Sequence, residues 1–193
     1  IGVDVFSEIH VFYDPDEGTV VSKAVIEAAA ALKKKLVLVK TAPGKVSGLP
    51  DKFNIYYSKA YLYSDFFRYA NNALAGKIVF VSNADIVFDS SAFKLQQALS
   101  APGMNNSVYT LSRHNTPCPD CTHWTCTPTL CFVGSHSSDV FAFVSPLPES
   151  LVMRTNHRQD RKGSENIVIA EFAHAGMNIS NPCKSVTILH RHC

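Results

Sequence analysis

The sequence has little net charge and no long apolar run, and these two absences limit the classes of partner and location that we expect. The formal net charge is +2, from 18 basic and 16 acidic residues, so composition gives no argument for nucleic acid or an anionic membrane surface as a partner. No apolar run reaches the ~20 residues that span a bilayer, so we expect no membrane span in this chain. No signal peptide is recognisable. Because the chain begins at Ile1 rather than at a methionine, we expect a fragment boundary or a processed end there.

What the chain does have is the composition of a globular protein. Of its 193 residues, 46% are hydrophobic and 18% are charged, which is typical of a folded domain rather than a disordered chain. This length suffices for one domain with a sizeable core. No internal repeat and no low-complexity tract divides it. We therefore expect a single domain over residues 1–193, with a Cys-rich insertion at about 114–138.

Short apolar runs alternate with helical patterns along the chain. Strands are predicted at residues 9–13, 36–39, 78–81, 108–111, 140–144, 177–180 and 185–189. Helices are predicted over residues 21–32, 64–74 and 165–175, with Ser64 and Ser164 as candidate caps, and a shorter helix runs from Ser90 or Ser91 to Leu99. This alternation predicts an α/β fold in three layers, with a mostly parallel sheet flanked by helices.

The most informative stretch is the strand predicted at residues 78–81 and the polar residues after it. Ile78 to Val81 is a continuous β-branched and aromatic run, typical of a strand that is covered on both faces. Asn83, Asp85 and Asp89 follow at once, where the ligand crevice of an open α/β sheet lies. Oxygen ligands at such a tip suit a hard divalent cation. The alternative is that these side chains only form a turn and cap the next helix.

Four of the six cysteines fall within 14 residues. Cys118, Cys121, Cys126 and Cys131 have a spacing that suits a tetrahedral structural zinc ion. The alternative is one or two disulfides that hold a long insertion together, which requires an oxidising compartment. In either case we predict a structural role, because four zinc ligands would leave no open coordination position for catalysis.

The segment from Phe66 to Asp85 resembles the core of a GT-A-type glycosyltransferase. In that fold a helix that bears an Asn, followed by a Gly, leads into a strand that ends in an Asp-x-Asp metal motif. Here the helix carries Asn71, and the motif is Asn83-Ala84-Asp85. The chain is most similar to a small group of such domains from algae, plants and large algal viruses, whose motif also has the form Asn-x-Asp.

Further motifs of that group occur in the same order. They are Gly134-Ser135-His136, Ser138-Asp139-Val140-Phe141-Ala142-Phe143, Gly163-Ser164-Glu165-Asn166, Asn181-Pro182-Cys183 and the closing His190-x-His192. The matches run from about residue 8 to residue 193. The chain departs from the pattern at its start, where residues 1–9 resemble the end of the first helix. The resemblance thus implies a minimal GT-A fold that lacks its opening βα unit, which helps to bind the nucleotide base.

The resemblance implies a metal-dependent glycosyltransferase, which moves a hexosyl or similar sugar from a nucleotide-sugar donor to a hydroxyl group of a glycan or protein acceptor. Asp85 is expected to bind Mn²⁺ or Mg²⁺, which stabilises the leaving diphosphate as a Lewis acid. His190 lies at the end of the last predicted strand, where GT-A enzymes often place a second metal ligand. Asn71, Asn83, Asp85 and Arg113 are expected to contact the nucleotide sugar.

If the sugar is transferred with inversion, a carboxylate must take the proton of the acceptor hydroxyl. Asp139 and Glu165 are the candidates for this catalytic base. Each has a structural alternative. Asp139 can form the turn before a strand, and Glu165 can interact favourably with the dipole of the helix that it begins.

A function of a different class is also open. A relative without catalytic activity could bind a glycan or a partner protein, with the Cys-rich insertion as the recognition element. The missing opening unit and the single carboxylate of Asn83-Ala84-Asp85 favour this alternative. The cysteines do not decide the compartment, and both the Golgi lumen and the cytoplasm are compatible with the sequence.

Overall fold

The computed structural model describes residues 6–13, 35–40, 61–83, 86–115 and 138–190. In chain order its elements are β1 (Glu8–Tyr13), β2 (Lys35–Lys40), α3 (Tyr63–Ala73), β3 (Ile78–Ser82), β4 (Ile86–Phe88), the 3-10 helix η2 (Ser90–Ala92), α4 (Phe93–Leu99), the 3-10 helix η3 (Met104–Asn106), β5 (Ser107–Leu111), β6 (His114–Asn115), β7 (Val140–Val144), α5 (Glu149–Arg154), α6 (Ser164–His174), β8 (Asn178–Ser180) and β9 (Ile188–His190). No helix in the described ranges is long and apolar enough to cross a membrane.

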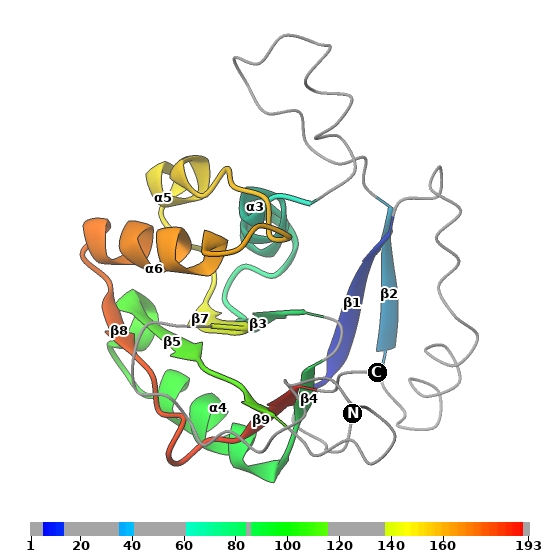
Figure 1. Cartoon of the computed structure of the whole chain (residues 1–193), viewed down its shortest axis with the longest axis vertical. Helices are drawn as coiled ribbons and strands as arrows, with labels where there is room; N and C mark the ends of the chain where they lie inside the picture. Colours follow the sequence, from blue (N-terminus) through cyan, green and yellow to red (C-terminus); the bar gives the residue numbers. More distant parts are fainter. Residues whose placement is uncertain (1–5, 14–34, 41–60, 84–85, 116–137, 191–193) are drawn as a thin grey trace, which may run out of the picture.

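Most of the predicted elements are confirmed (Figure 1). The apolar runs at 9–13, 36–39, 78–81, 108–111 and 140–144 form β1, β2, β3, β5 and β7. The helices predicted over 64–74 and 165–175 form α3 and α6, each shifted by one residue toward the amino terminus. The helix predicted over 21–32 and most of the Cys-rich insertion lie outside the described residues.

The main sheet has four strands in the order β3-β7-β5-β8, and a second sheet has the order β4-β9-β6. The α/β class is therefore confirmed, but the prediction of a mostly parallel sheet is corrected. The pairs β1–β2, β5–β8 and β6–β9 are parallel, whereas β3–β7, β5–β7 and β4–β9 are antiparallel. The sheet arrangement is mixed.

The direction of β7 follows from where it enters the sheet. A parallel partner for β5 would first have to return to the other edge through a crossover connection. Instead, β7 begins beside the residue at which β5 ends, and the backbone N–H of Asp139 donates to the carbonyl oxygen of Leu111 at 3.0 Å. The chain therefore runs back along β5 in the opposite direction.

Side chains of β7 alternate between the two faces of the main sheet. Phe141 and Phe143 belong to the core under α3, α5 and α6, which cover one face together (Figure 1). The ring centroid of Phe67 on α3 lies 5.7 Å from those of Phe143 and of Phe172 on α6. These edge-to-face aromatic contacts join the helical layer to the sheet.

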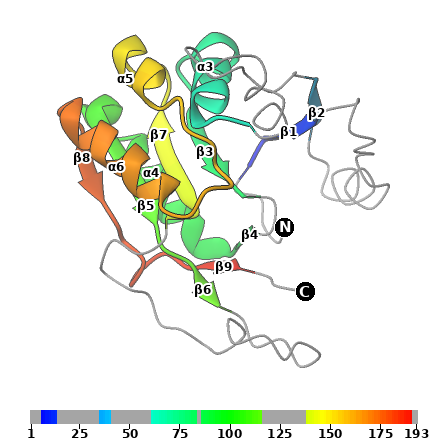
Figure 2. The ribbon, with the colours of Figure 1, turned by 45° about the horizontal axis from the view of Figure 1, so that its top comes forward.

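The opposite face of the main sheet carries a second core. Val140 and Ala142 of β7 pack there with Leu95 and Leu99 of α4 and with Ile188 of β9. The second sheet lies beside α4 on this face, and Figure 2 shows β9 and β6 running below the main sheet. The main sheet is thus the middle of three layers.

Candidate functional site

Three polar residues meet at one edge of the main sheet. β3 and β5 both run antiparallel to β7, so both end at the edge where β7 begins. Val140, the first residue of β7, is the register partner of Ser82 at the end of β3 and of Leu111 at the end of β5. The residues just beyond these ends are Asn83, Arg113 and Asp139. The sheet therefore brings together three residues that are up to 56 positions apart in sequence.

The carboxylate of Asp139 is the centre of this group. Its Oδ1 accepts a hydrogen bond from Nη1 of Arg113 at 3.2 Å and another from Nδ2 of Asn83 at 3.4 Å. The side chain of Asp139 is 3% exposed, whereas that of Arg113 is 29% exposed. A buried carboxylate requires such a partner because removing its charge from water is costly. Arg113 thus neutralises Asp139 while part of its own side chain remains exposed to solvent.

Glu165 brings a second carboxylate to the same site. It lies in the first turn of α6, after Gly163, whose φ of 86° is in the left-handed region that favours glycine. Glu165 is half-buried. Burial raises the pKa of its carboxyl, and the charge of Asp139 raises that pKa further. A hydrogen bond from its own backbone N–H and the Arg113 guanidinium act in the opposite direction.

Tyr63 shares this electrostatic environment from the start of α3. Its side chain is 4% exposed, and its ring packs in the core, 6.2 Å from that of Phe67 and 5.6 Å from that of Phe141. Burial raises the pKa of its phenol, and the charges of Glu165 and Asp139 raise that pKa further. Tyr63 therefore stays neutral beside two carboxylates, with its ring fixed by aromatic contacts.

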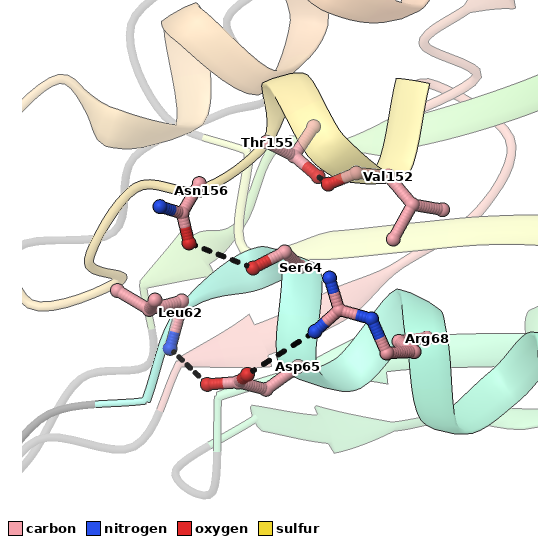
Figure 3. Close-up of polar contacts among 7 residues, drawn as sticks. All are labelled: Leu62, Ser64, Asp65, Arg68, Val152, Thr155 and Asn156. Carbon is pink, nitrogen blue, oxygen red and sulfur yellow. Dashed lines mark hydrogen bonds and ion pairs between the residues drawn. The ribbon is translucent and has the colours of Figure 1, made fainter. Parts of the chain in front are cut away.

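The amino terminus of α3 is anchored by its own Asp65 rather than by Ser64. The helix begins after Leu62, whose backbone N–H donates to Oδ2 of Asp65 at 3.0 Å (Figure 3). Arg68 lies 3.9 Å from the other oxygen of Asp65. The prediction that Ser64 caps this helix is corrected, because Ser64 is the second residue of the helix.

The chain after α5 provides the remaining hydrogen-bond acceptors for α3. The carbonyl oxygens of Thr155 and His157 accept the backbone N–H groups of Ser64 and Tyr63, each at 3.0 Å. The hydroxyl of Ser64 donates to Oδ1 of Asn156 at 3.2 Å, as Figure 3 shows. These bonds satisfy donors that a helix amino terminus leaves open. They also connect α3, which carries Tyr63, to the loop that leads into α6.

His190 occupies the end of β9, as the sequence predicts, and is 3% exposed. It is the register partner of Ile86, the first residue of β4. Ile86 directly follows Asp85 in the sequence, but Asp85 itself lies outside the described residues. Among the residues that are described, no three His, Cys, Asp or Glu side chains form a group that could hold a metal ion.

Among the predicted nucleotide contacts that the structure describes, Asn71 alone lies elsewhere. Its Nδ2 donates to the carbonyl oxygen of Leu147 at 2.8 Å, and its Oδ1 accepts the backbone N–H of Leu147 at 2.7 Å. The hydroxyl of Ser145 also reaches Oδ1 of Asn71, at 3.4 Å. Leu147 follows the carboxyl end of β7, whereas Asp139 precedes its amino end. Asn71 therefore lies at the opposite edge of the sheet and holds a turn.

The predicted cysteine cluster of Cys118, Cys121, Cys126 and Cys131 lies outside the described residues. Cys183, which follows β8, is described. It is 1% exposed and disulfide-bonded, and its partner lies outside the described ranges.

Comparison with known proteins adds no assignment to this geometry. The chain matches no model of a known protein family, and no curated protein matches it either. The residues gathered at the edge of the main sheet are therefore the basis for a function.

Proposed function

We propose that this chain is a GT-A-type glycosyltransferase domain that moves a sugar from a nucleotide-sugar donor to a hydroxyl acceptor. The observation that carries the proposal is the convergence of Asn83, Arg113, Asp139 and Glu165 at the edge where β3 and β5 end. Ligands of open α/β sheets bind outside the carboxyl ends of the strands. A guanidinium there suits a diphosphate, and a half-buried carboxylate suits proton transfer.

Glu165 is the better of the two candidate bases. Oδ1 of Asp139 already accepts hydrogen bonds from Arg113 and Asn83, and the side chain of Asp139 is only 3% exposed, so an acceptor hydroxyl would reach the half-buried Glu165 more easily. Burial raises the pKa of Glu165, which brings a carboxylate closer to the optimum for proton transfer at neutral pH. In an inverting step, the acceptor oxygen bonds to the anomeric carbon as the bond from that carbon to the diphosphate breaks. The acceptor proton goes to Glu165, and the nucleoside diphosphate leaves.

Arg113 and Asp139 have different tasks in this proposal. The side chain of Arg113 is partly exposed, and in this proposal its guanidinium contacts a phosphate while it remains bonded to Asp139. Asp139 positions Arg113 and the amide of Asn83. Asp85 and His190 would hold the divalent cation. The register of β4 and β9 supports this pair of ligands, because His190 lies opposite Ile86, the residue that follows Asp85 in the sequence. The cation supplies Lewis-acid stabilisation of the leaving diphosphate.

Calorimetric titration with nucleoside diphosphates, with and without Mn²⁺, tests this function. We expect binding that depends on Mn²⁺, and we expect Asp85→Ala to abolish the metal-dependent part. Glu149→Ala, which removes an exposed acidic side chain on α5, is the control and should bind as the parent chain does. If no nucleoside diphosphate gives a metal-dependent heat, the transferase proposal is wrong for this chain.

A second experiment addresses the base. In an assay with a nucleotide sugar and an acceptor that the parent chain uses, Glu165→Gln should reduce kcat by about 10²- to 10⁴-fold, which is the usual contribution of a general base. Nucleotide binding should persist in this variant, because Gln keeps the size of the side chain. Loss of binding together with kcat would instead indicate that Glu165 holds the site together.

One observation favours a second candidate function, that of a non-catalytic domain that binds a glycan or a partner protein. The ion pair between Arg113 and Asp139 is complete within the chain, so these two side chains have a structural role without any ligand. Binding of oligosaccharides without Mn²⁺, together with no release of nucleotide from any sugar donor, would support this candidate over the transferase.

A further inference from the structure

The side chain of Asn181 links the carboxyl-terminal part of the chain to Ser112, the residue before Arg113. Nδ2 of Asn181 donates to Oγ of Ser112 at 2.8 Å, and the backbone N–H of Ser112 donates to Oδ1 of Asn181 at 3.4 Å. Ser112 is 5% exposed and directly precedes Arg113. The amide of Asn181 therefore holds both the backbone and the side chain of the residue next to the guanidinium of the candidate site.

The contact between Asn181 and Ser112 lies just beyond the point where the pairing of β5 with β8 ends. β8 lies parallel to β5, and the last register pair is Tyr109 with Ser180. Beyond Ser180 the chain turns away at Pro182, which cannot donate a backbone hydrogen bond to a sheet. The side of β5 that faces β8 would otherwise lose its support after Tyr109, four residues before Arg113. The side-chain amide of Asn181, with one donor group and one acceptor, takes over at Ser112.

The backbone on the other side of Arg113 is held by the same carboxyl-terminal segment. His114 begins β6 and is the register partner of Leu189 in β9. Nδ1 of His114 lies 3.3 Å from the carbonyl oxygen of Ile188. Arg113 is thus flanked by two residues that both bond to the stretch from Asn181 to His190.

The turn that carries Asn181 is itself fixed. The backbone N–H groups of Ser185 and Val186 donate to the carbonyl oxygen of Pro182 at 2.8 and 2.9 Å. Nζ of Lys94 on α4 donates to the carbonyl oxygen of Ser185 at 2.9 Å. Cys183, in the same turn, is buried and disulfide-bonded. Asn181 is therefore a rigid support for Ser112.

We propose that Asn181 is a positioning residue, which acts through Ser112 to hold Arg113 against Asp139 and beside Glu165. The relevance of this role to sugar transfer rests on the proposed function, but the positioning itself does not. Without the Asn181 contact, the backbone at Ser112 is released and Arg113 moves away from the site. Glu165 then loses the cation that opposes the effect of its burial, and its carboxyl binds its proton more tightly.

The test is an NMR titration of the Glu165 side chain, whose resonance is assigned by its absence in Glu165→Gln. It uses the folded chain without nucleotide or sugar, so failure of the transferase function does not affect it. We expect Asn181→Ala to move the midpoint of the Glu165 titration upward, in the same direction as Arg113→Ala. In the Arg113→Ala background, Asn181→Ala should produce no further shift.

Asn106→Ala is the matched control. It removes a hydrogen bond of 2.9 Å from Nδ2 of Asn106 to the carbonyl oxygen of Gly176, which joins two elements far from the site. It should leave the Glu165 titration unchanged. The proposal is overturned if Asn181→Ala leaves the midpoint in place, if Arg113→Ala does so, or if the shifts of the two variants add. Should Asn181→Ala not fold, Ser112→Ala removes only the contact at Oγ, and an unchanged Glu165 midpoint in that variant overturns the proposal equally.

Discussion

Arg113 and Asp139 form an ion pair of 3.2 Å in which the side chain of Asp139 is buried and that of Arg113 is partly exposed. This asymmetry makes the two partners unequal in their effect on stability. Removal of Arg113 leaves an uncompensated negative charge in the interior, whereas removal of Asp139 leaves a cation that can reach water. The pair therefore links the stability of the sheet edge to the charge of the candidate site.

We predict that Arg113→Met lowers the free energy of unfolding by about 3 kcal/mol at neutral pH, because it leaves the Asp139 carboxylate buried without its cation. The double variant Arg113→Met with Asp139→Leu should recover most of this loss, since apolar residues can replace a buried ion pair. Urea unfolding measures both. Arg68→Met is the control: that side chain is 49% exposed and lies 3.9 Å from Asp65, so its loss should cost less than about 1 kcal/mol. Equal losses of stability in Arg113→Met and Arg68→Met would contradict the view that a buried carboxylate makes the loss of its cation more costly.

Asn71 and its neighbour Asn72 give a matched pair for a second prediction. Asn71→Ala removes three hydrogen bonds to Ser145 and Leu147, so we expect a loss of about 2 kcal/mol in the free energy of unfolding. Asn72 is exposed, and Asn72→Ala should have almost no effect. Urea unfolding gives the stabilities, and calorimetry gives nucleotide binding. Loss of metal-dependent nucleotide binding in Asn71→Ala, with unchanged stability, would instead favour the role that the resemblance to glycosyltransferases implies for Asn71.

The sequence predicts β1, β2, β3, β5 and β7 well, because each of them contains a short, mostly apolar run. It does not predict the short strands β4 and β6, and the last strand, predicted at 185–189, is Ile188–His190. The apolar runs from Ile78 and from Val140 are strands, and the polar residues Asn83 and Asp139 lie just outside them. The site could therefore be located in part before the structure was known. The contact between Asn83 and Asp139, 56 residues apart, is not predicted by the sequence, and only the structure shows that the two ends meet.

What the sequence does not predict depends on contacts between distant segments. Strand direction is one example, since an apolar run such as Val140–Val144 has the same pattern whether it pairs parallel or antiparallel. The hydrogen bonds of Asn71 are another, because they join residues 76 positions apart. The helix Glu149–Arg154 has six residues, too few for a helical period to show in the sequence. Nothing in the sequence around Ser112 predicts its contact with Asn181, apart from its position just after β5.

A third prediction concerns Cys183, which is buried and disulfide-bonded. Cys183→Ala should lower the free energy of unfolding by about 2 to 4 kcal/mol, the usual contribution of a native disulfide. Urea unfolding with and without reductant measures this loss. Reductant should destabilise the parent chain by a similar amount and should have a smaller effect on the variant. Labelling of Cys183 by an alkylating reagent in the folded, unreduced chain would show instead that this thiol is free.

The last prediction is the dependence of stability on pH through Glu165. Burial raises the pKa of this carboxyl in the folded chain, so folding favours its protonated form. Its contribution to stability is therefore fully present below the pKa of the unfolded chain, and it declines as the pH rises through the higher pKa of the folded chain. Glu165→Gln has no proton to lose. Relative to the parent chain, the variant should become more stable as the pH rises through this window.

Urea unfolding of Glu165→Gln and of the parent chain at a series of pH values from about 4 to about 8 measures this difference. Glu149→Gln is the control, because Glu149 also lies in the first turn of a helix but is exposed. Both substitutions remove a negative charge from a helix amino terminus, and only Glu165→Gln removes a carboxyl next to Asp139 and Arg113. If the two variants depended on pH in the same way, the helix dipole alone would explain Glu165, and its assignment as the catalytic base would lose its electrostatic support.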